Sequence, residues 1–228
     1  MEPPAPRRTL GADYDSDWAR RFPARFARTV LLETVLRPAV AALGAPERDG
    51  IDRRAGLGDG PVIFAGNHHS HLDTPVVLTS IPEPWRYKVF VGAAADYFFR
   101  TRLTSAASAL VIGAIPIERS KVTRRSADQA SALIADGWSM LIFPEGGRSP
   151  DGWGQPFRGG AAYLSSRCQV PVVPLHIEGT ARILRKGAKR PTPAAVRVTY
   201  GTPLLPLEGE SAARYAERIE RAVAELAD

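Results

Sequence analysis

The sequence predicts an α/β fold in which one mostly parallel or mixed sheet is flanked by helices. Short apolar runs recur between residues 61 and 201, and segments of helical length separate them. This alternation of strands and helices is typical of a sheet whose strands are joined by crossover helices. The chain has 228 residues, of which 44% are hydrophobic, and is therefore long enough to bury the core of a single domain.

The expected elements follow from this alternation. Strands are predicted at 61–66, 89–94, 113–118, 139–144, 170–178 and 195–201. Helices are predicted at 73–80, 96–108, 123–136, 159–168 and 211–227. In the last helix, Tyr215, Ile219, Val223 and Leu226 recur at four- and three-residue steps. This spacing places the four side chains on one face, so the helix is expected to cover the sheet.

The first 44 residues are predicted to form a flexible tail, at 1–13, and an amphipathic helical segment. Apolar residues recur at helical spacing over 17–43, and five arginines with one acid lie between positions 18 and 37. Pro23 and Pro38 predict two shorter helices rather than one. A basic segment with a tryptophan and two phenylalanines is typical of a helix lying in a membrane interface. A helix packed on the domain, with its arginines toward water, would show the same pattern.

The polar, glycine-containing stretch 45–60 is expected to link this segment to a domain at 61–228. The longest uncharged run, 103–117, is shorter than the ~20 residues of a spanning helix. The first apolar run comes late, so no secretory signal is expected. The single cysteine, Cys168, excludes an internal disulfide and fits a reducing compartment. It is expected to be a small buried residue of a helix rather than a nucleophile, and the protein is expected to be cytoplasmic.

The segment His68-His69-Ser70-His71-Leu72-Asp73 holds three of the four histidines of the chain. It follows an apolar run and the pair Gly66-Asn67, an order that predicts a buried strand, a turn and the start of a helix. A histidine and an aspartate five positions apart across such a turn can fold back to face each other. The aspartate can then fix the tautomer of the imidazole and leave its other nitrogen basic. His68 and Asp73 are therefore candidates for a general base that activates a hydroxyl or a water.

Two other interpretations of these residues remain open. The spacing His69-x-His71-x-Asp73 resembles the metal-binding run of metallo-β-lactamase-like hydrolases, but a threonine follows the aspartate. The remaining histidine, His176, leaves too few imidazole ligands for a two-metal site, so no metal is expected. Polar residues at the start of a helix also serve as ordinary caps.

Two further strand ends carry arginine. The run 141–149 enters a glycine-containing turn with Glu145, Gly146 and Arg148, and the run 113–119 ends in Arg119. A guanidinium group matches a phosphate in a bidentate fashion, and glycine-rich turns expose backbone N–H groups to the same oxygens. The two arginines therefore predict a shared anionic subsite.

Together the motifs resemble those of the glycerophospholipid acyltransferases, of the 1-acylglycerol-3-phosphate O-acyltransferase type. Asn67-His68-x-Ser70-x-x-Asp73 is similar to their His-x4-Asp motif, and residues 113–119, 143–149 and 170–174 are similar to their second, third and fourth motifs. The four motifs occur in the order of the family, over about residues 60–205. Gly147 stands where a threonine is usual, and Pro116 where an aromatic or aliphatic residue is usual. Neither departure removes a reactive group.

The resemblance implies a glycerol-3-phosphate acyltransferase-like fold and acyl transfer to the free hydroxyl of a lysophospholipid. The simplest acceptor is 1-acylglycerol 3-phosphate, and the product is then phosphatidic acid. The donor would be an acyl thioester, either acyl-CoA or acyl carrier protein, with no further cofactor. His68 would act as the base, oriented by Asp73. A hydrolase that uses His68 to activate water is a rival within the enzymes.

The resemblance also implies that Arg119 and Arg148 bind the phosphate of the acceptor, while Glu145 and Gly146 shape the glycerol subsite. A lysolipid acceptor without a phosphate is the alternative. The net charge of +6 would suit a nucleic-acid-binding domain. Such a domain would interleave aromatic residues with its arginines on an exposed sheet, whereas the aromatics here cluster in the N-terminal segment and near 97–99. No nucleic acid is therefore expected as a partner. The expected partners are the lysophospholipid acceptor, the acyl thioester donor and, through the basic N-terminal segment, the inner face of the cell membrane.

Overall fold

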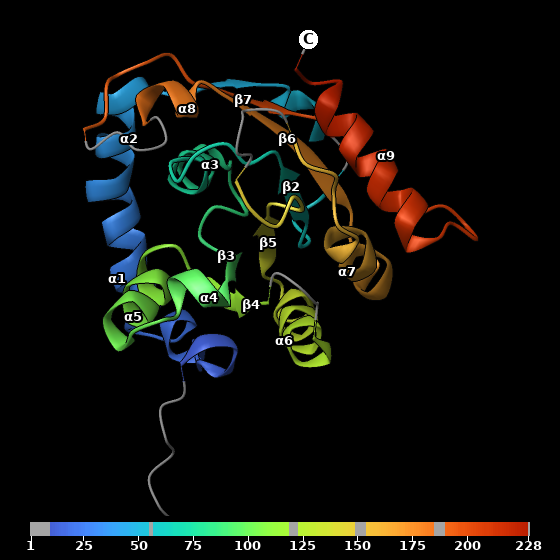
Figure 1. Cartoon of the computed structure of the whole chain (residues 1–228), viewed down its shortest axis with the longest axis horizontal. Helices are drawn as coiled ribbons and strands as arrows, with labels where there is room; N and C mark the ends of the chain where they lie inside the picture. Colours follow the sequence, from blue (N-terminus) through green and yellow to red (C-terminus); the bar gives the residue numbers. More distant parts are fainter. Residues whose placement is uncertain (1–9, 55–56, 119–122, 149–153, 185–189, 228) are drawn as a thin grey trace, which may run out of the picture.

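The computed structural model describes residues 10–54, 57–118, 123–148, 154–184 and 190–227 (Figure 1). Within them, seven strands form one sheet in the order β1-β7-β6-β2-β5-β3-β4. Neighbouring strands are parallel except for β6 and β7, which are antiparallel. The predicted fold class, a mostly parallel, mixed sheet flanked by helices, is confirmed.

The strands are β1 (Glu47–Asp49), β2 (Ile63–Gly66), β3 (Val89–Ala94), β4 (Ala114–Ile117), β5 (Ser139–Ile142), β6 (Val172–Glu178) and β7 (Arg197–Tyr200). Six of them lie within the ranges predicted for strands. The seventh, β1, lies in the stretch expected to be a linker and pairs in parallel with β7. It is an exposed edge strand of three charged residues and so carries no apolar pattern. Besides the backbone pairing, Glu47 of β1 forms an ion pair with Arg197 of β7.

Most predicted helices are present, namely α3 (Asp73–Ser80), α6 (Arg124–Ala135), α7 (Gly160–Cys168) and α9 (Ala212–Ala224). The single helix predicted at 96–108 is wrong, because the chain forms α4 (Ala95–Phe98) and then α5 (Arg102–Val111). Thr101 separates them: its backbone is extended, and its side chain caps α5 by accepting the N–H of Thr104. The short helix α8 (Thr180–Ile183) was not predicted.

The N-terminal segment forms short 3-10 turns, η1 (Gly11–Asp13) and η2 (Asp17–Arg20), followed by α1 (Ala24–Leu31), the π-helical turn η3 (Leu32–Leu36) and α2 (Arg37–Gly44). Another 3-10 turn, η4 (Ile51–Arg54), follows β1. The predicted break at Pro38 is wrong, because helical backbone continues through it. The wider π turn ends just before Pro38, with the N–H of Arg37 donating to the carbonyl of Leu32, and so accommodates a residue without an N–H. Residues 1–9 of the predicted tail lie outside the described residues.

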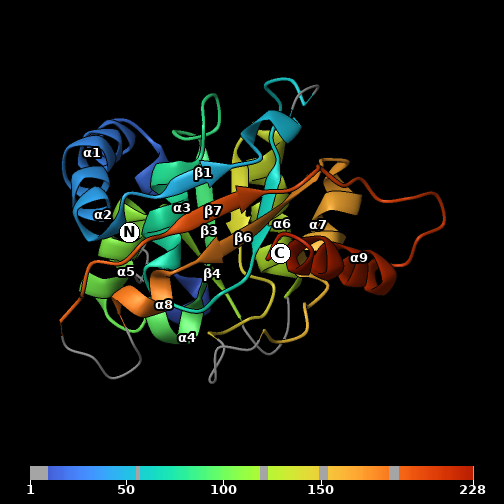
Figure 2. The ribbon, with the colours of Figure 1, turned by 90° about the horizontal axis from the view of Figure 1, so that it is seen from above.

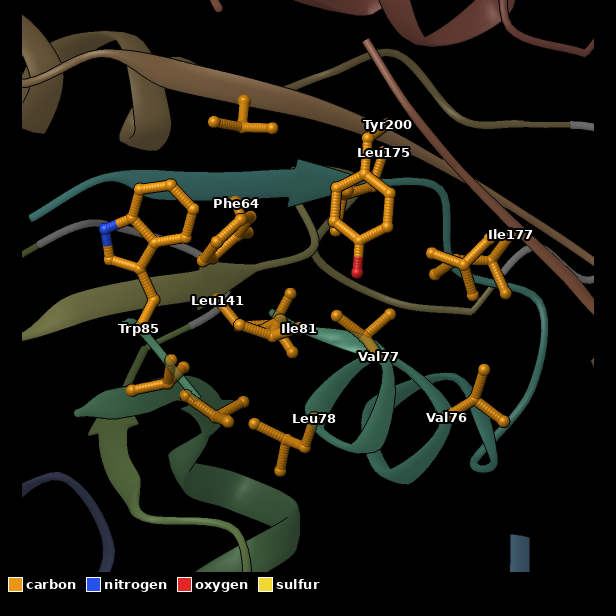
Figure 3. Close-up of a cluster of buried hydrophobic side chains, with 14 of the residues drawn as sticks. Phe64, Val76, Val77, Leu78, Ile81, Trp85, Leu141, Leu175, Ile177 and Tyr200 are labelled. Atoms are coloured by element: carbon orange, nitrogen blue, oxygen red, sulfur yellow. The ribbon is translucent and has the colours of Figure 1, made fainter. Parts of the chain in front are cut away.

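Two layers of helices cover the sheet (Figures 1 and 2). On one face, α3 packs over Phe64, Leu141 and Leu175 (Figure 3). Val40 of α2 belongs to the same cluster. On the other, α6, α7 and α9 pack over alternate residues of the same strands, including Ile63. Strand β2 is therefore buried on both faces, which explains why its sequence is continuously apolar. Among the described residues, no helix combines the length and apolar character needed to cross a membrane.

Candidate active site

The histidine-rich segment lies at the carboxyl end of the central strand β2, between β2 and α3. Because β2, β3, β4 and β5 are parallel, the segments that follow them meet at the same edge of the sheet. A pocket of about 480 Å³ opens there. His68 and His71 line it from the β2–α3 turn, and Gly146 and Arg148 line it from the turn after β5. Parallel α/β sheets commonly bind ligands at this edge.

His68 and Asp73 form a hydrogen-bonded pair at the wall of this pocket. The Nδ1 atom of His68 lies 2.9 Å from Oδ2 of Asp73, which is fully buried. The imidazole ring stacks on Phe143, with ring centroids 4.3 Å apart and planes 14° from parallel. Since Nδ1 is engaged by the carboxylate and the ring lines the pocket, Nε2 is the nitrogen available to a substrate.

Asp73 is held by several donors. Its Oδ2 also accepts the backbone N–H groups of His69 and Ser70, at 2.7 and 2.8 Å, and its Oδ1 accepts the hydroxyl of Thr180. These donors satisfy both oxygens of the buried carboxylate and hold its orientation. The N-cap residue of α3, Leu72, makes no side-chain capping bond, and Oγ of Ser70 instead accepts the N–H of Leu72 at 3.2 Å.

Glu145 lies behind the pocket wall. Its side chain is only 1% exposed, and both carboxylate oxygens accept backbone N–H groups: Oε1 that of His68 at 2.8 Å, and Oε2 that of Gln155 at 3.1 Å. This placement favours a role in holding the backbone of His68 over the predicted part in a glycerol subsite. Glu145 is not among the residues that line the pocket.

The basic wall of the pocket is formed after β5. Gly146 has a φ of +73°, and a Cβ atom there would lie 2.8 Å from Nε of Arg158. The glycine thus permits both the left-handed turn and the close approach of this arginine. Arg148 and Arg158 both line the pocket. Arg119 lies outside the described residues, but Glu118, its neighbour in sequence, lines the pocket at the end of β4.

His71 lines the pocket beside Tyr97. Its ring stacks on Tyr97, with centroids 5.5 Å apart, and Nε2 lies 3.4 Å from the tyrosine hydroxyl. Partial burial, followed by the charges of Arg148 and His68, lowers the pKa of His71 below its ordinary value, although Asp73 opposes this. This shift favours the neutral form of His71.

The structure does not gather the histidines into a metal centre. Burial lowers the pKa of His176, on β6, and His69 lowers it further. In the described part of the chain, no group of three or more His, Cys, Asp or Glu residues could hold a metal ion. Cys168 is partly buried at the end of α7 and is absent from the pocket lining.

The remaining wall of the pocket is apolar. It is built from β3, β4, the end of β5 and residues near them: Val91, Ala93, Phe98, Ile112, Ile117 and Ile142. Tyr97, Arg158 and Thr180 were not singled out from the sequence, because none belongs to a chemical motif. A weak signal for Thr180 was its position directly after a glycine at the end of a predicted strand.

A histidine–aspartate pair beside one apolar and one basic wall is an arrangement that can perform general-base chemistry and can accommodate an apolar chain and an anionic group. A family model described as Acyltransferase matches residues 46–178, more than half of the chain. The chain belongs to this family, which confirms the resemblance seen in the motifs.

Proteins with similar sequences are named as 1-acyl-sn-glycerol-3-phosphate acyltransferases. A chloroplastic 1-acyl-sn-glycerol-3-phosphate acyltransferase from Brassica napus is 31% identical over 134 residues, which are 58% of this chain and 37% of that protein. The human 1-acyl-sn-glycerol-3-phosphate acyltransferase alpha is 26% identical over 65% of this chain and 51% of its own length. The chain thus spans about half or less of these relatives.

The fold also has a solved counterpart. The crystal structure of the 1-acyl-sn-glycerophosphate acyltransferase PlsC from Thermotoga maritima superposes with a TM-score of 0.69. The match covers 91% of this chain and 83% of the other, at 22% identity, and it shows a shared fold.

Proposed function

We propose that this protein transfers a fatty acyl group from an acyl thioester to the free hydroxyl of a lysophospholipid, most simply 1-acylglycerol 3-phosphate. The observation that carries the proposal is the His68–Asp73 pair, which presents one ring nitrogen to a pocket with an apolar wall and an arginine wall. The names of the relatives support 1-acylglycerol 3-phosphate as the acceptor. They leave open whether the donor is acyl-CoA or acyl carrier protein.

In the proposed reaction, the acceptor hydroxyl donates a hydrogen bond to Nε2 of His68. As its oxygen bonds to the thioester carbonyl carbon, the proton passes to Nε2, and Asp73 stabilises the resulting imidazolium. The tetrahedral intermediate then collapses, the C–S bond breaks, and the leaving thiolate takes the proton from the imidazolium. A positioned base of this kind contributes roughly 10²–10⁴-fold to the rate. No covalent acyl-enzyme and no cofactor are required.

The two walls of the pocket suit the two ends of the substrates. Arg148 would bind the phosphate of the acceptor, together with the predicted Arg119, and the guanidinium group of Arg158 lies on the same side. The apolar wall would take an acyl chain, because burying methylene groups against it removes them from water.

We also propose that the protein works as a peripheral protein on the inner face of the cell membrane. Phe22, just before α1, and Phe26, in α1, are 83% and 63% exposed, and Leu103 of the neighbouring helix α5 is 80% exposed. Arg21 and Arg25, both exposed, lie beside them. Large apolar side chains flanked by arginines are typical of a surface that enters the headgroup region of an anionic bilayer.

The test is an acceptor panel with palmitoyl-CoA or oleoyl-CoA as donor, for the natural protein and for His68→Ala. We expect transfer to 1-acylglycerol 3-phosphate, lost in the variant although it remains folded. Release of free fatty acid without an acceptor would make the protein a hydrolase. Preference for an acceptor without a phosphate would replace the proposed substrate.

A further inference from the structure

Thr180 lies outside all four acyltransferase motifs of the sequence, yet it contacts the candidate catalytic pair. It begins α8, which a single residue separates from the end of β6, and Thr180 is 1% exposed. Gly179 precedes it with a φ of +90°, and a Cβ atom at that glycine would lie 2.0 Å from the carbonyl oxygen of Ala195. This turn, which a glycine alone accommodates, brings Thr180 from the end of β6 back to Asp73.

Thr180 and the other donors to Asp73 contact different oxygens of its carboxylate. The Thr180 hydroxyl donates to Oδ1 of Asp73, whereas His68, His69 and Ser70 all donate to Oδ2. Among the hydrogen bonds of the described residues, the one from Thr180 is the bond that reaches Oδ1. It therefore opposes rotation of the carboxylate about its Cβ–Cγ bond.

The end of β6 also makes hydrogen bonds to Asn67, the residue before His68. The side chain of Asn67, just before His68, donates to the carbonyl of Ile177 at 2.9 Å and accepts its N–H at 2.7 Å. One strand end thus holds both the residue before His68 and the carboxylate of Asp73. A frame of this kind preorganises the pair before substrate binds.

We propose that Thr180 is a positioning residue that keeps Oδ2 of Asp73 aimed at Nδ1 of His68. This inference rests on the proposed function, in which His68 is the base. When the imidazolium forms, the carboxylate must already be oriented toward it, so the contribution of Thr180 is made in the transition state. Loss of the hydroxyl should therefore lower kcat and leave KM for both substrates nearly unchanged.

The variants are Thr180→Val, which keeps the shape and removes the hydroxyl, and Thr180→Ser, which keeps the hydroxyl. The matched control is Thr79→Val on α3, because its buried hydroxyl donates to the carbonyls of Pro75 and Val76 rather than to the pair. We expect Thr180→Val to lose roughly 10- to 100-fold in kcat, as for a hydrogen bond to a charged group. Thr180→Ser should keep most of the activity, and Thr79→Val should match the natural protein.

A second measurement is the NMR resonance of the His68 Nδ1–H proton, assigned by its absence in His68→Ala. We expect it to be shifted or lost in Thr180→Val and to be retained in Thr180→Ser and Thr79→Val. Should Thr180→Val fail to fold, Thr180→Ala replaces it with the same expectation. Full kcat with an unchanged resonance in a folded variant lacking the hydroxyl would overturn the inference.

The inference and the proposed function fail in different ways. If His68→Ala stays active, the base is wrong, whatever Thr180 does. If His68→Ala is inactive but Thr180→Val keeps full kcat, the base stands and the positioning role of Thr180 falls. Loss of kcat in Thr79→Val equal to that in Thr180→Val would also overturn the inference, because any buried hydroxyl would then suffice.

Discussion

Replacement of Asp73 by asparagine separates the charge of this residue from its shape. Three donors converge on Oδ2, so the amide oxygen should take that place and keep the Nδ1–H bond of His68. The amide NH2 group then faces Thr180, whose hydroxyl can rotate to accept it. The fold and the imidazole tautomer should therefore survive, while the negative charge beside the imidazolium is lost.

The expected magnitude follows from the distance of 2.9 Å between Nδ1 and Oδ2. At an effective dielectric constant of about 20, two unit charges at this separation attract by about 6 kcal/mol. The retained neutral hydrogen bond offsets about 1 kcal/mol of this. Each 1.36 kcal/mol added to the activation free energy lowers the rate tenfold, so kcat should fall roughly 10³- to 10⁴-fold.

The assay is colorimetric detection of the thiol released from palmitoyl-CoA in the presence of 1-acylglycerol 3-phosphate, combined with thermal unfolding. Asp136→Asn, at the exposed end of α6, is the matched control and should behave as the natural protein. A folded Asp73→Asn variant that keeps more than about a tenth of the natural kcat would refute the view that this charge stabilises an imidazolium in the transition state.

Three further predictions follow from the pocket and its surroundings. Arg148→Ala should raise KM for 1-acylglycerol 3-phosphate roughly 10- to 100-fold and leave KM for the donor nearly unchanged, while Arg148→Lys should recover part of the loss. Phe22→Ser combined with Phe26→Ser should weaken sedimentation with phosphatidylglycerol vesicles, because both side chains are exposed apolar groups. The lowered pKa values of His71 and His176 mean that the unfolded chain binds more protons than the folded one. The free energy of unfolding should therefore decrease as pH falls below the ordinary histidine pKa of about 6.5, and this slope should flatten when both histidines are replaced by glutamine.

Each of these predictions has a control and an opposing result. Arg221→Ala, on the exposed face of α9, should leave both KM values unchanged, and equal preference of the natural protein for monoacylglycerol would contradict the phosphate role of Arg148. Leu207→Ser, at an exposed apolar residue far from the N-terminal helix in sequence, should bind vesicles normally. Equal binding by the double phenylalanine variant would contradict the membrane surface. A pH slope that persists in the double glutamine variant would assign the effect to other groups.

Local patterns predicted the strands and the face-to-face placement of His68 and Asp73. His68 and Asp73 are only five positions apart across a strand-turn-helix junction, so the backbone between them can adopt few conformations. The first residue of the helix, Asp73, therefore places its carboxylate back against the turn. The same reasoning wrongly predicted one helix at 96–108. The apolar pattern continues through Thr101, but the side chain of Thr101 caps a new helix and so ends the preceding one. Local patterns also missed β1, whose charged residues carry no signal for an edge strand that pairs through its backbone.

The sequence by itself determined the fold class, the position of the histidine-rich turn and the chemistry that its residues can perform. These properties can be inferred from patterns among residues close in the chain. Two contacts were decided by the tertiary structure alone. Glu145, 77 residues from His68, accepts the backbone N–H of His68. Thr180, 107 residues from Asp73, donates a hydrogen bond to the carboxylate of Asp73. Those partners are set by the order of strands in the sheet, which places β6 and β5 on either side of β2, and by the left-handed turn at Gly179. No local pattern encodes that order, because it results from the packing of the whole sheet.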